Sequence, residues 1–383
     1  MELLRNFQGI TAKITQITLY QYTVSATKKF SFGTWTSRQH IFLRIDAGGA
    51  SGFGENILAV NRPEASPEPW ALHLKALKGC TVWEALCLLR KQIGSWEDRL
   101  TEMTEAALVD LAGRLTGRSA LELLGLAGRR PVWGAYVILS DDPAFAAEKA
   151  RWAREHGRAR FIKVKLFGES RLDCAVIRAV RKLCPQEETF LMGDVNCGYR
   201  PEGAQRPLDE IAAALGLLHH AGLDACEDPA FLSREEWVQL QRLSGSLALI
   251  PDYPMRPAGQ SIRWIARDMG RYYNIHPGCT ASILDAVELA GRIRQLGAGL
   301  MIGDDSLVGP GCSIWQQLAC GLGADWVEAV EKDGESDFYL RAVRSLPTDS
   351  RQNPITVQAQ VPGFGLDLDC AALEQAAHRI VPV

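Results

Sequence analysis

The chain has 383 residues and a formal net charge of -3, with 47% hydrophobic and 23% charged residues, which is typical of a folded protein and excludes a disordered one. The near-neutral charge argues against nucleic-acid binding, because phosphates require a strongly basic face. No apolar run is long enough for a membrane span, and the N-terminal residues lack a secretory signal. The ten cysteines contain no CxxC pair, so we expect a cytoplasmic protein with reduced thiols.

The first third of the chain changes from a strand pattern to a helix pattern. Residues from about Ile14 to Ala59 alternate apolar and polar, and residues 40–56 resemble two strands joined by a glycine-rich turn. From Thr81 to Leu124 apolar residues recur at three- and four-residue steps, and Gly125 is a stop signal. We therefore predict an α+β capping domain over residues 1–130.

From Pro131 onward short apolar runs alternate with amphipathic helices, which predicts parallel strands with right-handed crossovers. Strands are expected at 132–139, 161–166, 190–195, 224–229, 247–252, 272–277, 299–304 and 324–330. This series has the size of a closed TIM-type barrel, for which about 250 residues is typical. A doubly wound open sheet is less favoured, because no GxGxxG motif follows the first strand. We assign the barrel to residues 131–345 and a C-terminal segment that returns to the capping domain to residues 346–383.

Polar residues end most of these strands, at the edge where a parallel barrel has its active site. In chain order they are Lys163 and Lys165, Asp194 and Asn196, Glu227 and Asp228, Asp252, and Asn274 and His276. Carboxylates at three successive strand ends are the oxygen ligands that Mg²⁺ prefers, and Mn²⁺ accepts the same set. We predict that Asp194, Glu227 and Asp252 bind the metal. The alternative is that they only cap the following helices.

Two lysines share one face of the second strand. Lys163 and Lys165 are two residues apart, so both point inward or both outward, and burial of two ammonium groups against a helix would be costly. Pointing inward, each lowers the pKa of the other, which suits a general base. The alternative places both in solvent at the barrel rim. Across the barrel, we interpret His276 as the opposing acid or base, or else as a structural residue.

The order of these motifs resembles the enolase superfamily over nearly the whole chain, and specifically the muconate-lactonizing-enzyme subgroup of its mandelate racemase/muconate lactonizing enzyme family. The resemblance is carried by FGE at 53–55, the helical segment 106–125, IKVKLF, GDVN, CEDP and VPGFGLDLD. It implies a (β/α)7β modified TIM barrel with an α+β capping domain that the C-terminal tail completes. It also implies a symmetric homo-oligomer.

The resemblance further implies a shared first step, in which a divalent metal binds a substrate carboxylate and stabilises the enediolate left by removal of the α-proton. Lys165 would be the base, Lys163 would tune it or contact the carboxylate, and Asn196 would assist near the metal. The implied enzyme is a racemase, epimerase or cycloisomerase of a small carboxylate, such as an N-acyl amino acid, a dipeptide or a muconate-like acid. A lyase of the dehydratase or succinylbenzoate-synthase type, or a metal-binding homologue without turnover, remains the alternative.

Two departures from the pattern concern the fifth and sixth strands. The sixth reads NIHP where the subgroup has NIKP, so His276 stands in place of a lysine. The fifth keeps Asp252 but has Tyr253 in place of an acidic neighbour. The mandelate-racemase subgroup fits less well, because the seventh strand, MIGDDS, has no histidine. We therefore expect metal binding and α-proton abstraction, by either one base or two.

The distal end of the substrate is expected to contact loops of the capping domain and the eighth strand. A basic set that would suit a second anionic group comprises Lys28, Lys29, Trp35 and Arg38 in a first loop, and Asn56 and Arg62 in a second. By the resemblance to dipeptide epimerases, Glu331 and Asp333 near the eighth strand would pair with a substrate ammonium group.

Overall fold

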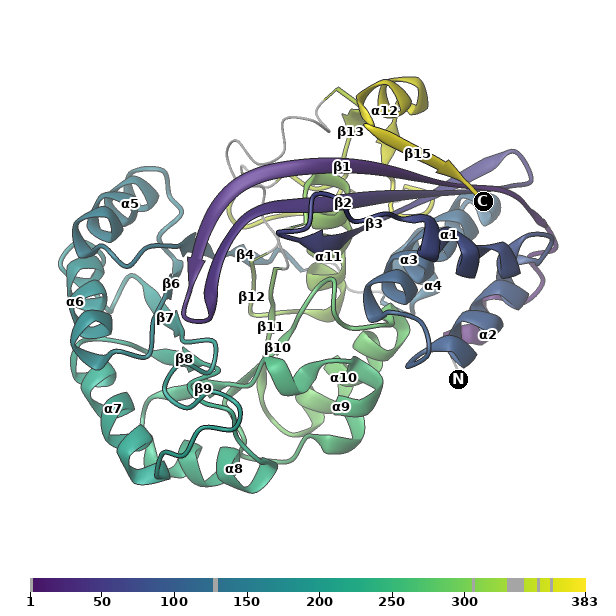
Figure 1. Cartoon of the computed structure of the whole chain (residues 1–383). Helices are drawn as coiled ribbons and strands as arrows, with labels where there is room; N and C mark the ends of the chain where they lie inside the picture. The colour runs from purple at the N-terminus through teal and green to yellow at the C-terminus, as the bar shows by residue number, and fades with distance from the viewer. Residues whose placement is uncertain (1–2, 127–129, 305–306, 329–340, 350–351, 359–360) are drawn as a thin grey trace.

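A computed structural model describes residues 3–126, 130–304, 307–328, 341–349, 352–358 and 361–383. Figure 1 shows an open antiparallel sheet with its helices beside a ring of parallel strands surrounded by helices. Both chain termini lie in the first of these units. In the described part of the chain, no helix is both long and apolar enough to cross a membrane.

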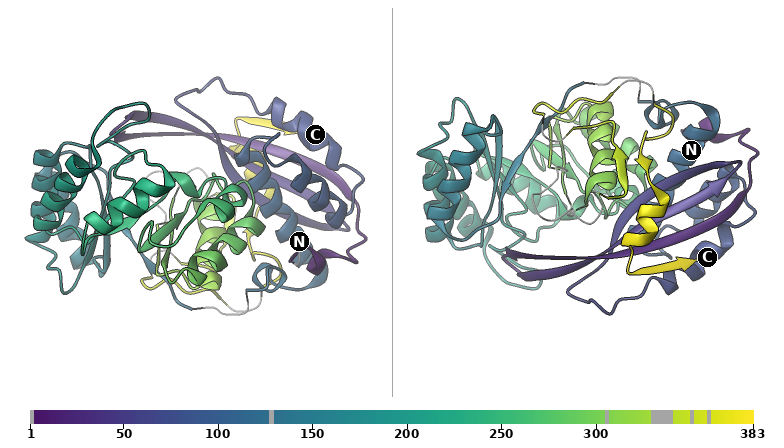
Figure 2. Two further views of the ribbon diagram at one scale, coloured as in Figure 1. Left: turned by 90° about the horizontal axis from the view of Figure 1, so that it is seen from below. Right: turned by 90° about the horizontal axis from the view of Figure 1, so that it is seen from above.

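The sheet of the capping domain is antiparallel, with the strand order β15-β1-β2-β3. Its strands are β1 (Ile14–Phe30), β2 (Gly33–Ala47), β3 (Ala50–Val60) and β15 (Arg379–Pro382). Gly48 and Gly49, with φ of 56° and 79°, make the tight turn between β2 and β3 that the glycine pair predicts. The β1–β2 hairpin continues beyond the sheet and arches over the barrel, as Figures 1 and 2 show.

The tip of this hairpin corrects a sequence prediction. Lys28 and Trp35, expected on a loop, are paired residues of β1 and β2, and the turn lies between Phe30 and Gly33. The Ser31 hydroxyl in this turn donates to the Val195 carbonyl of the barrel at 2.9 Å. The hairpin thus reaches the carboxyl ends of the barrel strands.

Helices cover one face of this sheet: α1 (Glu68–Leu74), α2 (Val82–Gln92), α3 (Asp98–Thr116) and α4 (Ala120–Leu123). All but α1 lie in the predicted helical segment. Helix α3 is buried all the way round from Leu100 to Gly113, because it lies between the sheet and the barrel. Glycines on β3 permit its close approach, since a Cβ atom on Gly52 or Gly54 would collide with backbone carbonyls of α3.

The parallel strands lie where the sequence predicts them. They are β4 (Trp133–Gly134), β5 (Tyr136–Ile138), β6 (Phe161–Lys165), β7 (Phe190–Asp194), β8 (Ala225–Glu227), β9 (Ala248–Ile250), β10 (Tyr272–Ile275), β11 (Gly299–Ile302) and β12 (Trp326–Val327). They pair as β5-β6-β7-β8-β9 and β10-β11-β12-β4. Backbone hydrogen bonds from Arg271 to Leu249 and from Asn274 to Pro251 join β9 to β10, so the ring closes.

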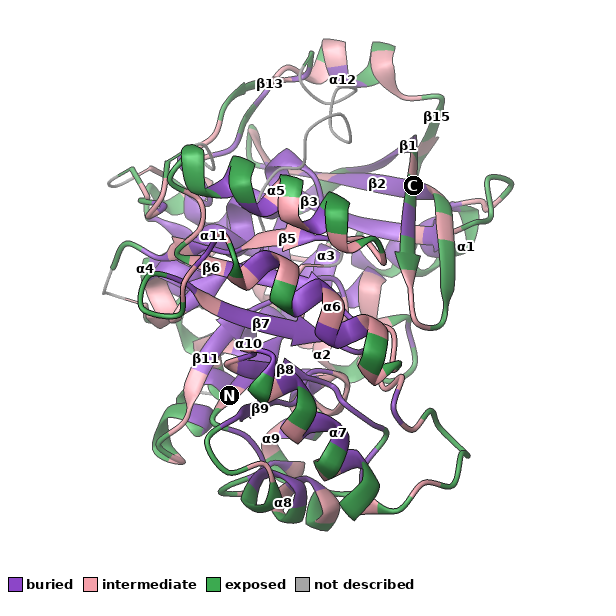
Figure 3. Cartoon of the chain, turned by 90° about the vertical axis from the view of Figure 1, so that its left-hand side faces the viewer, coloured by how far each residue is buried: buried purple, intermediate pink, exposed green. Residues whose placement is uncertain are grey.

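Helices alternate with these strands and form the outer layer: α5 (Pro143–Glu155), α6 (Ser170–Arg181), α7 (Leu208–His220), α8 (Arg234–Leu243), α9 (Ala258–Trp264), α10 (Ile283–Gln295) and α11 (Gly309–Leu322). Figure 3 shows buried strands inside and exposed outer helix faces. Aromatic rings in contact with one another, among them Phe161, Phe190 and Trp326, fill the amino-terminal end of the barrel. The cavity is therefore at the carboxyl end.

The C-terminal segment contains β13 (Val343–Ser345), β14 (Asp367–Leu368), α12 (Cys370–Ala376) and β15. Residues Thr18–Gln21 of β1 pair with β15, so the last strand lies in the capping sheet. The Phe364 N–H donates to buried Asp110 of α3 at 2.7 Å, and the same carboxylate accepts from Phe53 N–H at 3.1 Å. The predicted fold class is confirmed, whereas α12 was not expected.

Candidate active site

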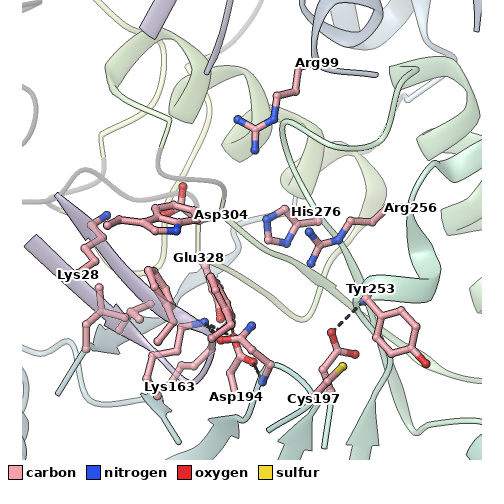
Figure 4. Close-up of a pocket in the computed structure, with 18 residues that line it drawn as sticks. Lys28, Arg99, Lys163, Asp194, Cys197, Tyr253, Arg256, His276, Asp304 and Glu328 are labelled. Atoms are coloured by element: carbon pink, nitrogen blue, oxygen red, sulfur yellow. Dashed lines mark hydrogen bonds and ion pairs between the residues drawn. The ribbon is translucent and has the colours of Figure 1, made fainter. Parts of the chain in front are cut away.

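A cavity of about 280 Å³ lies at the carboxyl ends of the barrel strands, below the β1–β2 hairpin. Figure 4 shows side chains from both units pointing into it. The lining residues are Lys28, Phe30, Phe32, Trp35, Arg99, Val137, Leu139, Lys163, Lys165, Asp194, Asn196, Cys197, Asp228, Tyr253, Arg256, His276, Asp304 and Glu328. Residues that are far apart in the sequence therefore form one site.

Both lysines of β6 point into the barrel, as their spacing predicts. Lys165 Nζ contacts Asp194 Oδ2 and donates to Asn196 Oδ1 at 3.0 Å. Its ammonium group also lies 5.1 Å from the ring centroid of Phe30, at the hairpin tip. The side chain is 10% exposed and lines the cavity, so Lys165 can reach a substrate with a small movement.

Lys163 is surrounded by carboxylates instead. Its Nζ donates to Glu227 Oε2 at 2.7 Å and to Glu328 Oε2 at 2.9 Å, and Asp194 Oδ2 is 3.3 Å away. Burial alone would lower its pKa, but the charges of Glu227, Glu328 and Asp194 raise the pKa of Lys163 well above the ordinary value. Without a bound cation the pKa of Lys163 is thus raised rather than lowered, because three carboxylates outweigh the neighbouring ammonium group.

The predicted metal ligands stand at the ends of three adjacent strands. Asp194 ends β7 and is the register partner of Glu227 on β8, and Asp252 follows β9. All three are buried, with at most 2% exposure. Glu227 Oε1 accepts from Asn274 Nδ2 at 2.8 Å, and Asp252 contacts the Arg256 guanidinium group. None of them caps the following helix, and their side chains face the barrel interior.

The balance of charge around these carboxylates differs from one to the next. Burial would raise the pKa of Asp194, but Lys165 and Lys163 hold it below the ordinary value. Burial likewise opposes ionisation of Asp252, and Arg256 and His276 lower its pKa in spite of that. For Glu227 burial prevails over Lys163, and its pKa is raised to about 8. The negative charge of the buried carboxylates therefore exceeds the positive charge that the neighbouring lysine and arginine side chains supply.

A hard divalent cation fits this site by donor type and by charge. Asp194, Glu227 and Asp252 offer only oxygen, and buried Asp252 Oδ1 accepts no hydrogen bond among the described residues, although His276 Nδ1 lies 3.2 Å away. In that same part of the chain, no three Asp, Glu, His or Cys side chains already stand close enough to hold an ion. The lysines and Arg256 contact these carboxylates, so metal binding requires that side chains rearrange.

His276 and Arg256 form the opposite side of the cavity. Both contact Asp252, and Figure 4 shows them across the cavity from Lys163. Asp228 serves a different purpose, since its two carboxylate oxygens accept from the Asp252 and Tyr253 N–H groups at 2.9 Å each. It shapes the turn that carries the predicted ligand Asp252.

The predicted contacts to the distal end of the substrate divide into two groups. Lys28 and Trp35 line the cavity, whereas Lys29 is exposed beside Asp141, Arg62 is exposed and Arg38 is buried away from the cavity. Asn56 needs correction: it is fully buried, and its amide donates to the Arg99 carbonyl at 2.9 Å and to the Gly278 carbonyl at 3.4 Å. Glu331 and Asp333 lie outside the described residues.

Sequence reasoning missed four charged residues of the cavity: Arg99, Arg256, Asp304 and Glu328. Glu328 directly follows β12, and its strand-end position was a usable signal, but β12 is too short for its phase to be read from periodicity. Arg99 lies in the first turn of α3 and Arg256 follows a short 3-10 helix, so no strand-end rule would find them.

No known protein-family profile and no curated protein sequence matches the chain. Solved structures do. A dipeptide epimerase from Cytophaga hutchinsonii, complexed with Mg and the dipeptide D-Ala-L-Val, is similar over 97% of this chain and 100% of its own, with 19% identity and a TM-score of 0.79. An N-succinyl Arg/Lys racemase from Bacillus cereus is similar over 97% and 100%, with 19% identity and a TM-score of 0.77.

A muconate lactonizing enzyme from Pseudomonas fluorescens, complexed with muconolactone, is similar over 96% of this chain and 100% of its own, with 19% identity and a TM-score of 0.77. These enzymes are members of the enolase superfamily. Because sequence identity is low, the likeness shows that the chain has their fold.

Proposed function

We propose that this protein is a divalent-metal-dependent enzyme that removes the proton α to a substrate carboxylate, as a racemase, epimerase or cycloisomerase of a small carboxylate. A bound Mg²⁺ or Mn²⁺ ion, with Asp194, Glu227 and Asp252 as its ligands, would stabilise negative charge on the substrate carboxylate. The dipeptide epimerase and the muconate lactonizing enzyme of the same fold act on small carboxylates of this kind.

The observation that carries the proposal is a proton-accepting group on each side of the buried carboxylates. Lys165 ends β6 and His276 follows β10, so the two line the cavity from opposite strands of the barrel. Lys165 takes the proton on its side as the free amine, Asn196 orients the Lys165 amino group, and His276 takes or returns a proton on the other side. Lys163, whose hydrogen bonds go to carboxylates, keeps Glu227 and Glu328 in place.

The outer part of the cavity would bind the remainder of the substrate. Lys28 and Arg99 supply positive charge there, while Phe30 and Trp35 supply an apolar surface. This composition supports substrates that carry an apolar segment and a second anionic group. Exchange rates for matched acids with and without that second anion would test the preference.

The experiment for the proposed activity is solvent deuterium uptake at the α-carbon, measured by NMR with Mg²⁺ present. The panel holds N-acyl amino acids, dipeptides, succinylbenzoate-type acids and sugar acids. Uptake with inversion supports the two-sided mechanism, and uptake without inversion supports one active base. Absence of uptake across the panel contradicts the proposal.

A lyase is the second candidate, because an imidazole at position 276 can donate a proton to a leaving group opposite Lys165. Loss of a β-hydroxyl group from a sugar acid would identify it. We further propose a cytoplasmic homo-oligomer. The cysteines, all free thiols, support a reducing compartment, and sedimentation would test the assembly.

A further inference from the structure

One face of helix α3 carries Arg99, Glu102 and Glu105 at three-residue steps, so the three side chains lie in a row. Arg99 lines the cavity, and the two glutamates are buried, with 3% and 1% exposure. A buried carboxylate is costly unless it is hydrogen-bonded. The partners of these glutamates therefore indicate what the row of side chains does.

Glu102 binds the loop that follows β10. Its Oε1 accepts from the Gly278 N–H at 2.7 Å, and its Oε2 accepts from the Thr280 N–H and hydroxyl at 2.8 Å each. The Gly278 carbonyl accepts in turn from Asn56 Nδ2 at 3.4 Å. The capping domain thus binds this short segment of the barrel in two ways. Glu102 accepts hydrogen bonds from its N–H and hydroxyl groups, and Asn56 donates to its Gly278 carbonyl.

This loop begins with His276. Before the histidine, the chain is fixed in β10 by the hydrogen bond from Asn274 N to the Pro251 carbonyl, and two residues after it comes the first contact with Glu102. The loop also contains Ala281 at a φ of 63°, a conformation that costs a non-glycine residue free energy and persists only when neighbouring contacts enforce it. In Figure 4 the imidazole of His276 lies below Arg99, across the cavity from Lys163.

We infer that Glu102 is a positioning residue that fixes the His276 loop, so that helix α3 of the capping domain determines where the imidazole stands in the cavity. Its effect on proton transfer rests on the proposed function, but its effect on the position of His276 does not. Arg99 extends from the same face of α3, one turn earlier, and lines the cavity. One helix therefore determines both the position of the His276 imidazole and part of the cavity wall.

The matched comparison is Glu102→Gln against Glu105→Gln. Each change replaces a buried carboxylate of α3 that accepts hydrogen bonds from the barrel. Glu105, however, accepts from Ser282 and Leu284, which lie farther along the chain from His276. With ¹³C-labelled histidine, the His276 signal is assigned by its loss in a His276→Asn variant. The chain has seven histidines, so the others serve as internal references.

We expect the His276 signal to move or broaden in Glu102→Gln and to remain unchanged in Glu105→Gln. An unchanged His276 signal in a folded Glu102→Gln protein overturns the inference. If that variant does not fold, Thr280→Val removes only the hydroxyl bond to Glu102 and should move the same signal by less. No movement in Thr280→Val likewise overturns it.

A second measurement compares rates of α-proton exchange. It uses a substrate for which the wild type exchanges the α-proton of both enantiomers. Glu102→Gln should slow α-proton exchange at least tenfold for the enantiomer served by His276 and leave the Lys165 enantiomer unchanged. An equal loss for both enantiomers overturns the positioning role. If the wild type exchanges no substrate, the proposed function fails, and the NMR comparison still decides the inference.

Discussion

The side of the cavity formed by β6, β7, β8 and β12 differs from the side formed by β9 and β10 in how its charges are compensated. On the first side, Lys163 meets Asp194, Glu227 and Glu328, which come from three different strands. On the second side, Asp252 contacts both Arg256 and His276.

This difference indicates which side chains are available for proton transfer. An ammonium group has three protons to donate, and those of Lys163 face three carboxylates, so it cannot approach a substrate without losing a partner. Lys165 and His276 line the cavity from opposite strands, and each contacts a carboxylate, Asp194 for Lys165 and Asp252 for His276. This difference supports the proposal that Lys165 and His276 transfer protons and that Lys163 has a structural role.

The largest effect is expected for Lys165→Ala, which removes the base of the first side. Alpha-proton exchange of the enantiomer that Lys165 serves should fall by about 10³-fold, within the usual range for general-base catalysis. The measurement is deuterium uptake by NMR. Mg²⁺ affinity and the thermal unfolding midpoint should remain close to wild type, and retained exchange would refute Lys165 as the base.

His276→Asn tests the second side and should have the next largest effect. Inversion and exchange of the opposite enantiomer should slow by about 10²-fold, because proton transfer on that face loses its imidazole. Exchange on the Lys165 face should continue, so the two enantiomers diverge in deuterium uptake. If both rates fall together, the two sides do not act separately.

Asp194→Asn tests a predicted metal ligand on the first side. The change removes one charged oxygen ligand and the partner of Lys165, so Mg²⁺ affinity should fall at least about tenfold and exchange should fall with it. Titration calorimetry measures the affinity. Asp304→Asn is the matched control, because Asp304 lines the cavity but is not a predicted ligand. Unchanged affinity in Asp194→Asn contradicts the ligand assignment.

The smallest predicted effect concerns Glu105, which contacts the loop after β10, and the free energy of unfolding. Burial raises the pKa of Glu105 to about 7 in spite of its bonds to Leu284 and Ser282. The folded state therefore binds this proton more tightly than the unfolded state does, and the free energy of unfolding should fall by about 2 kcal/mol between pH 5 and pH 7 on account of this group. Urea unfolding of Glu105→Gln at several pH values should lack that decrease. An identical pH dependence in the wild type and the variant would contradict the prediction.

Much of the barrel and of its carboxyl rim could be predicted from the sequence. The alternation of short apolar runs with amphipathic helices placed the parallel strands, and in such a barrel all strands end at one rim. That rule brought Lys163, Lys165, Asp194 and His276 to the same cavity, where the structure has them. The spacing of Lys163 and Lys165 also predicted that both share one face, because side chains on a strand alternate with period two, and the cost of burying two ammonium groups against a helix favoured the inward face.

Other features depended on contacts between segments that are distant in the sequence. The sequence could not show that three carboxylates surround Lys163, that Asn56 is buried against the loop after β10, or that Arg99 reaches the cavity from a helix. Neither did it distinguish Glu328 from its acidic neighbours, since two residues of β12 define no phase.

The sequence by itself therefore determined the order of elements, the strand-end residues and the kinds of ligand at the rim, because these follow from local periodicity and one topological rule. Only the tertiary structure decided that Lys163 is surrounded by three carboxylates, whereas Lys165 contacts Asp194 and Asn196. It also decided how the capping domain contacts the His276 loop. Burial and pairing of charges depend on neighbours that the fold brings together from distant parts of the chain.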